Sequence, residues 1–354
     1  MDYVLKKRNE TADLLKGLAV LCMIQVHIME QFTNQDVYNS IIGKISLFLG
    51  GPPCAPVFLA VMGYFLLSGS KSFWYYLQRG GILLIGGILL NILRSLHLFY
   101  HIIGGKFELA PMFFIFGVDI LQLAGLSIII VGILHLIFKK NYIPYLILAI
   151  LIPIISSFIP TYNSAGLTTQ YLFAFVGGNY GWSYFPLIPW ISYVLLGIAF
   201  RLFTFKNKSV LDFINQKYLF FLLPLVAALL ITYKYGINTA HDLQGNGGYY
   251  HHDIKYFVWI CAFLFVYIFI INKLENSIAK NALFNFIKWT GKNVTAIYII
   301  QWILIGNIAT LIYKTQTIYQ NILWFIIITS TSSLIVFAYS KFIEYRNNED
   351  ESII

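Results

Sequence analysis

Charged residues are scarce in this 354-residue chain. Asp, Glu, Lys and Arg together make up 11%, apolar residues make up 58%, and the mean hydropathy is +0.73. This composition excludes an ordinary soluble domain, in which about 25% of residues are charged. Cysteine is also rare, because only Cys22, Cys54 and Cys261 occur, all in apolar stretches. Three cysteines so placed provide neither a disulfide framework nor a metal-ligand spacing, and we expect no metal.

Long apolar runs, by contrast, recur along the whole chain. Windows of about 20 apolar residues are long enough to cross the hydrocarbon core of a membrane as helices. Ten of them lie at 12–31, 52–70, 80–100, 114–138, 142–159, 184–204, 217–235, 256–272, 290–312 and 320–342. The sequence therefore predicts an all-α fold, a polytopic transmembrane helix bundle of about ten spans, as a single domain over residues 1–354.

The formal net charge of +9 might suggest nucleic acid as a partner, but the positions of the charges give a simpler explanation. With the N-terminus in the cytoplasm, most of the 24 Lys and Arg residues fall in cytoplasmic loops and span ends. The exceptions are Lys44, Arg94, Lys106, Lys234, Lys255 and Lys314. The positive-inside rule then predicts that both termini are cytoplasmic. We expect a multi-pass protein of a bacterial cytoplasmic membrane with no nucleic-acid partner.

The first apolar window, DLLKGLAVLCMIQVHIME, carries ionisable residues on one face. At 100° per residue, Asp13, Lys16 and His27 fall within roughly 60°. Such residues inside a span usually face the bundle interior or a watery cavity. His27 has an imidazole suited to general base catalysis, and Glu30, three residues later, could orient it. The alternative is a structural histidine that only makes a hydrogen bond.

Two further windows contain polar groups that could serve a site. Asn91 and Arg94 share a broad face of the third window, and Asp119 and Gln122 lie one turn apart in the fourth. Arg94 demands acceptors and could stabilise an anion or oxyanion; otherwise its side chain reaches the outer interface. Asp119 and Gln122 predict either a structural network between helices or direct contact with a substrate.

Basic residues at the cytoplasmic ends of spans are candidates for holding phosphate. Arg79 lies at the mouth of the third window, and Lys288, Lys292 and Asn293 surround the start of the ninth. A helix N-terminus with nearby lysines can bind an anion. Each of these residues could equally be a topology anchor or an ordinary charged helix start.

The order of several motifs resembles known membrane acyltransferases. DLLKGLA followed by His27 resembles the D-x-x-R-G-x-A opening of acyltransferase family 3, with Lys16 where Arg is usual. The later segments resemble the heparan-α-glucosaminide N-acetyltransferase catalytic-domain family, a related branch of the transmembrane acyltransferase superfamily. They are PVFLAVMGYFL, FGVDILQLAGLSII, YFPLIPWISYVLLGIAF and WTGKNVTAIYIIQW. In that lysosomal branch the catalytic histidine is expected after the first span, where this chain has none.

The resemblance implies an acyl-CoA-dependent O- or N-acyltransferase at the cell envelope. It would move an acyl group, acetyl from cytosolic acetyl-CoA, to an amine or hydroxyl of a sugar or glycan at the outer side. On that pattern His27 is the acyl-transfer histidine or the general base. From the residues themselves, we expect Asn91 and Arg94 to stabilise the oxyanion. Asp119 and Gln122 would hold the network and complete the catalytic set. The donor set is Asp13, Lys16, Arg79, Lys288, Lys292 and Asn293.

Other functions are compatible with the same buried charges. A transporter or flippase for a polar or lipid-linked solute would line its pathway with such residues, and a structural membrane protein is a third possibility. Acetyl-CoA binding would separate the enzyme from both. Membrane lipid is an expected partner in each case, and the sequence leaves a homodimer open.

Overall fold

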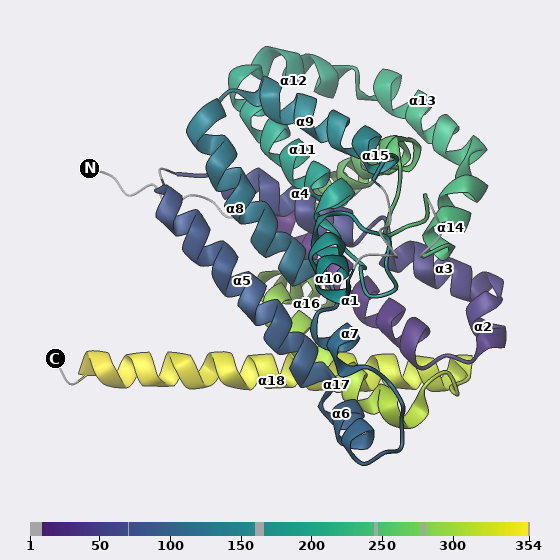
Figure 1. Ribbon diagram of the computed structural model, residues 1–354. Helices are drawn as coiled ribbons and strands as arrows, with labels where there is room; N and C mark the ends of the chain where they lie inside the picture. Colours follow the sequence, from purple (N-terminus) through teal and green to yellow (C-terminus); the bar gives the residue numbers. More distant parts are fainter. Residues whose placement is uncertain (1–8, 70, 160–165, 244–246, 278–280, 353–354) are drawn as a thin grey trace.

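The structure is a computed structural model that describes residues 9–69, 71–159, 166–243, 247–277 and 281–352 (Figure 1). In this part of the chain it is a bundle of helices. Eight helical segments are long and apolar enough to cross a membrane: Glu10–Gln31 (α1), Ile41–Leu66 (α3, Ile41–Gly50, and α4, Ala55–Leu66), Phe73–Arg94 (α5), Ile120–Phe138 (α8), Leu187–Lys206 (α11), Ile254–Glu275 in α15 (Ile254–Ser277), Val294–Ile312 (α17) and Ile318–Arg346 in α18 (Ile318–Ser352). This confirms the predicted all-α polytopic fold.

Two of the ten predicted windows form shorter or broken helices. Window 142–159 is the 15-residue helix α9, Tyr142–Ser156, which contains Pro153. Window 217–235 belongs to a bent pair, α12 (Lys208–Gln216) and α13 (Tyr218–Ile231), which meet at 70°. Counting the bent pair as one span brings the number to nine. The remaining short helices are α2 (Gln35–Asn39), α6 (Leu96–Ile103), α7 (Pro111–Ile115), α10 (Leu167–Val176), α14 (Tyr233–His241) and α16 (Ala282–Lys292).

Helix α1 lies in the middle of the bundle and packs against α3, α4, α15, α16, α17 and α18. Its first half meets α16 at very close range. A Cβ atom on Gly291 would fall on the carbonyl oxygen of Asp13, and one on Gly17 would fall on that of Ile287. Because lipid is as apolar as the side chains, helices in membranes gain most by such close approach of their backbones. The absence of side chains at these two glycines therefore allows the backbones of α1 and α16 to be in direct contact.

The connecting segments divide into two sides of the bundle. On one side the backbone of Val118, just before α8, bonds to Trp182 and Tyr184, just before α11. The end of α1 bonds to the α17–α18 connection on this same side, through Asn34 and Gln316. On the other side, Lys288 of α16 reaches Glu10 of α1 and Glu275 of α15. The last turns of α18 extend beyond the bundle (Figure 1).

The start of α8 corrects the fourth predicted window. The window began at residue 114 and placed Asp119 inside the span, but the helix starts at Ile120 with Asp119 as its N-cap. Asp119 and Gln122 form a capping box, in which the side chain of each residue accepts a hydrogen bond from the backbone N–H of the other. The D-x-x-Q pattern before an apolar run is the sequence signal of this start.

Candidate functional site

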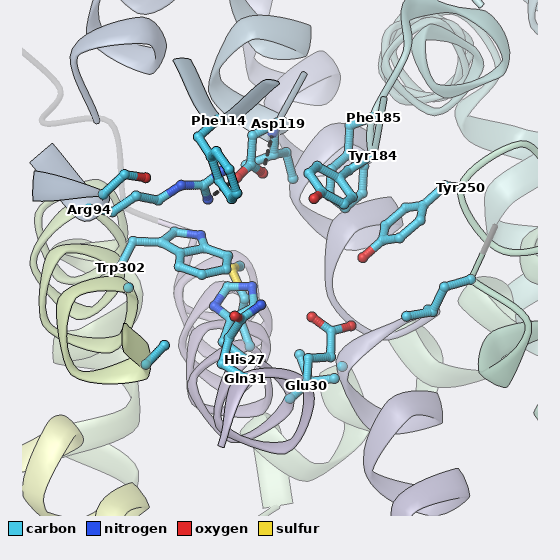
Figure 2. Close-up of a pocket in the computed structure, with 18 of the residues that line it drawn as sticks. His27, Glu30, Gln31, Arg94, Phe114, Asp119, Tyr184, Phe185, Tyr250 and Trp302 are labelled. Atoms are coloured by element: carbon cyan, nitrogen blue, oxygen red, sulfur yellow. Dashed lines mark hydrogen bonds and ion pairs between the residues drawn. The ribbon is translucent and has the colours of Figure 1, made fainter. Parts of the chain in front are cut away.

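A cavity of about 590 Å³ lies at the C-terminal end of α1. It is on the side that the Lys and Arg distribution predicts to be external. Helices α1, α5 and α17 contribute to its wall, together with the α3–α4 junction and the segments before α7, α8, α11 and α15. Figure 2 shows polar groups from opposite walls pointing into one space: Arg94 and Asp119 at one end, His27 and Glu30 on one wall, and Tyr184 and Tyr250 across from them.

His27 faces this cavity in a fixed orientation. Its Nδ1 lies 3.2 Å from the Oε1 of Gln301, and the Nε2 of Gln301 donates to the carbonyl oxygen of Tyr298 at 3.1 Å. Since the amide nitrogen of Gln301 is committed as a donor, its oxygen accepts a hydrogen bond from Nδ1–H of His27. The neutral imidazole then has its free lone pair on Nε2. Gln301 therefore holds the tautomer that a general base requires.

Trp302 links His27 to the second polar group of the cavity. Its ring stacks on the imidazole of His27, with centroids 3.8 Å apart. The guanidinium of Arg94 lies 4.5 Å from the same indole, and Figure 2 shows Trp302 between the two side chains. Such contacts of a cation with an aromatic face are favourable, more so away from water. The Nε1–H of Trp302 is buried without a hydrogen bond of ordinary geometry in the described structure.

Arg94 and Asp119 form a close ion pair. The Nη1 of Arg94, the last residue of α5, donates to Oδ2 of Asp119 at 2.7 Å, and both side chains are largely buried. Oδ1 of Asp119 accepts from the backbone N–H of Ile120. Each charge is thus neutralised and hydrogen-bonded, which a buried ion pair needs to be tolerated.

Asn91 and Gln122, two residues of the predicted catalytic set, lie behind this pair and do not line the cavity. The Nδ2 of Asn91 donates to the carbonyl oxygens of Ile115 and Gly117, at 3.0 and 2.7 Å, and Nε2 of Gln122 donates to Gly117 at 3.2 Å. Both amide hydrogens of Asn91 are committed in this way. These two side chains position the turn that carries Asp119.

The residues of the predicted donor set lie away from the cavity, and none of them lines it. Lys16 pairs with Asp13 at 3.0 Å, on the half of α1 that packs against α16. Lys288 is buried and satisfied by two carboxylates, Glu10 at 2.6 Å and Glu275 at 3.1 Å. Arg79 and Lys292 are exposed, and Arg79 donates to the hydroxyl of Tyr75. The side-chain amide of Asn293 donates to the backbone carbonyl of Trp289.

Two histidines of the 241–253 segment secure the wall opposite His27. His252 is fully buried; its Nδ1–H donates to the carbonyl of Tyr249, and its Nε2 accepts from the hydroxyl of Tyr193, both at 2.9 Å. His251 donates from Nε2 to the carbonyl of Ser183 at 2.9 Å. We call residues 183–185 and 249–252 the loop clamp, because these bonds tie the two segments that carry the tyrosines of the cavity.

The loop clamp should loosen in acid. Burial lowers the pKa of both His251 and His252 to about 4, below the ordinary value of 6.5. Between these values the unfolded chain binds more protons than the folded one, so stability falls as pH falls. We expect the melting temperature of the purified protein to be constant above about pH 6.5 and to decrease toward pH 4.

The variant His252→Gln isolates this effect, because glutamine keeps hydrogen-bonding groups but does not titrate. Its melting temperature should depend less on pH in this range than that of the native protein. His135→Gln, at a histidine of α8 outside both the cavity lining and the loop clamp, is the matched control and should keep the native profile. An unchanged profile in His252→Gln would exclude His252 as the acid-sensitive residue.

Sequence reasoning missed several residues of this site. Gln301 and Trp302 lie within the motif WTGKNVTAIYIIQW, but nothing in the motif shows which wall they face. Glu30 was considered only as a partner that could orient His27, a role that Gln301 fills instead. A polar residue next to a tryptophan inside an apolar run is the one signal that could have indicated Gln301.

The fold and the site together define a multi-pass membrane protein with a buried polar cavity built around one imidazole. Comparison with known families gives the class its name. The model of acyltransferase family 3, an acyltransferase domain, matches residues 9–341, nearly the whole chain. The chain belongs to acyltransferase family 3. The match does not confirm the narrower resemblance to the heparan-α-glucosaminide N-acetyltransferase family, and no curated protein and no solved structure matches the chain.

Proposed function

We propose that this membrane acyltransferase moves an acetyl group from cytosolic acetyl-CoA to a hydroxyl or amine of a sugar or cell-envelope glycan at the outer side of a bacterial cytoplasmic membrane. The observation that carries the proposal is the orientation of His27. Gln301 leaves the Nε2 of His27 free as a base, and the imidazole lines a cavity large enough for a substrate. The family supplies the reaction class, because its members share an acyltransferase domain.

The proposed chemistry uses groups that the cavity brings together. Nε2 of His27 takes the proton of the acceptor hydroxyl or amine, whose oxygen or nitrogen attacks the thioester carbonyl. The C–S bond breaks, and the departing thiolate takes the proton back from the imidazolium. The Nε1–H of Trp302 and the remaining guanidinium N–H groups of Arg94 are the donors available to the oxyanion. An acyl-imidazole intermediate would use the same nitrogen of His27.

The donor must reach this cavity from the opposite side of the bundle. Lys16 and His27 are 11 residues apart on α1, about 16 Å along its axis. Because α1 and α16 are in backbone contact beside Lys16, we propose that the phosphates of CoA bind the exposed Arg79 and Lys292 rather than the buried Lys288. The thioester arm would then extend along the bundle toward His27.

Acetyl transfer from radiolabelled acetyl-CoA by the purified protein tests this function. If Arg79 and Lys292 hold the phosphates, Arg79→Ala and Lys292→Ala should each raise the KM for acetyl-CoA and reduce its dependence on salt. The KM for the acceptor should be unchanged, because neither residue lines the cavity.

Lys208→Ala is the matched control. Lys208 is also an exposed lysine, at the start of α12 and on the side predicted to be cytoplasmic. Its removal should leave the KM for acetyl-CoA as it is. Equal donor KM in all three variants and the native protein would return Arg79 and Lys292 to the role of topology anchors. A protein that neither binds acetyl-CoA nor transfers acetyl from it would refute the proposed donor.

A further inference from the structure

Glu30 is a carboxyl group in the cavity that pairs with no cation of the described residues. The charged side chains that line the cavity are Glu30, Arg94 and Asp119. Arg94 and Asp119 neutralise each other at 2.7 Å. In the described part of the chain, Glu30 makes neither an ion pair nor a hydrogen bond, and Figure 2 shows its carboxylate extending into the open space one turn beyond His27. Away from bulk water such a carboxyl group forms hydrogen bonds with hydroxyl and ammonium groups, whereas an anionic ligand would find no unpaired cation among the residues that line the cavity.

The wall facing Glu30 offers further polar atoms without protein partners. The hydroxyls of Tyr184 and Tyr250 point into the cavity across from Glu30 and bond no described residue (Figure 2). The hydroxyl of Tyr249, which is 4% exposed and also lines the cavity, is buried without a hydrogen-bond partner among the described residues. Buried polar groups are normally satisfied, so a group of orphans around one space indicates a polar ligand.

This wall is rigid rather than a mobile loop surface. The backbone carbonyl of Tyr250 accepts from Nε1 of Trp190 at 2.8 Å, and the ring of Tyr250 packs edge-on against Phe185 with centroids 5.3 Å apart. The bond from His251 to Ser183 joins the two segments. These contacts place the two hydroxyls opposite Glu30 before any ligand binds.

We propose that Glu30, Tyr184 and Tyr250 form the acceptor subsite, and that Glu30 selects acceptors presenting a hydroxyl or ammonium group there while rejecting those with a carboxylate or phosphate. The inference rests on the proposed transfer reaction, whose base lies one turn away on the same helix. It also separates the two substrates, because this end of the cavity offers the phosphates of the donor no unpaired cation among its lining residues.

Three methyl glycosides probe the subsite: methyl glucoside, methyl glucosaminide, which carries an amine in place of the C2 hydroxyl, and methyl glucuronide, which carries a carboxylate at C6. With acetyl-CoA as donor, the full-length protein should acetylate the neutral or the amino glycoside and discriminate against the glucuronide. Glu30→Gln keeps the size of the side chain and removes its ability to ionise against an ammonium group. It should raise the acceptor KM about 10- to 100-fold, the usual effect of losing a hydrogen bond to a charged group. It should also narrow the discrimination against the glucuronide, with the KM for acetyl-CoA unchanged.

Glu108→Gln is the matched control. Glu108 is exposed, and its neighbours Phe107 and Leu109 line the cavity although Glu108 does not. It should behave as the native protein. Equal acceptor KM and equal discrimination in Glu30→Gln and the native protein would overturn the proposal, as would a native preference for the glucuronide.

A second measurement does not depend on transfer. An apolar carbodiimide should modify Glu30, and mass spectrometry of peptides should show protection by methyl glucoside or methyl glucosaminide but not by methyl glucuronide. Protection without acetyl transfer would refute the proposed function and retain the subsite. Absence of protection by either uncharged or cationic glycoside, or equal protection by the glucuronide, would refute the subsite whatever the transfer assay shows.

Discussion

Replacing His27 with asparagine should reduce acetyl transfer about 10²–10⁴-fold, the usual contribution of a general base. The protein should stay folded, because asparagine retains polarity and can still bond the Oε1 of Gln301, the partner of Nδ1 in the native protein. His27→Ala should be equally inactive and should also lose the stacking contact with Trp302. Turnover and melting temperature of both variants, with acetyl-CoA binding measured in parallel, give the answer.

The comparison with His101→Asn makes the result specific. His101 lies on α6 outside the cavity lining, so its replacement should leave turnover unchanged. Gln301→Leu extends the test to the orientation of the base: it should lower kcat by less than His27→Asn and leave the donor KM unchanged. An active and stable His27→Asn enzyme would show that His27 is a structural hydrogen-bonding residue and that the base lies elsewhere.

Breaking the Arg94–Asp119 pair should cause the largest loss of stability of any substitution in the cavity. Asp119→Asn keeps an N-cap side chain on α8 but leaves the guanidinium of Arg94 buried without its carboxylate. Removing one partner of a buried pair typically costs about 3–5 kcal/mol, a large fraction of the usual 5–15 kcal/mol of stability. We expect poor expression or a strongly lowered melting temperature for Asp119→Asn and for Arg94→Met.

The double variant separates stability from chemistry. Arg94→Met with Asp119→Asn removes both charges, so its melting temperature should lie above that of either single variant. If Arg94 also stabilises the oxyanion, this recovered protein should remain poorly active while binding acetyl-CoA normally. Additive losses of melting temperature would show that the two side chains do not stabilise each other. Recovery of activity along with stability would leave Arg94 only a structural role.

Much of this architecture could be predicted from local sequence patterns. The apolar windows predict the membrane helices, because an apolar run of sufficient length must form a helix inside lipid whatever its neighbours are. The same reasoning places Asp13, Lys16 and His27 on one face of α1, since helical geometry determines the relative directions of residues on a single helix. The pattern of Asp119 and Gln122 contains the information for the start of α8, although the predicted window did not use it.

Which of the predicted site residues meet in one cavity could not be predicted from local sequence patterns. One helical face suggested that Asp13, Lys16 and His27 act together, yet only His27 lines the cavity. The reason is the close contact of α1 with α16, which the glycines at 17 and 291 allow and which no pattern within α1 reveals. Similarly, Asn91 was predicted beside an oxyanion, but the chain fold places two backbone carbonyls against its amide.

By itself, then, the sequence determined the class of fold, the approximate spans, the family and the candidacy of His27, Arg94 and Asp119. These depend on composition and on spacing within one helix, which are short-range properties. Only the tertiary structure decided that Gln301 orients His27 from 274 positions away, that Trp302 lies between His27 and Arg94, and that Glu30 faces tyrosines from two distant segments. Such pairings depend on which helix faces meet, and that is set by the packing of the whole bundle at once.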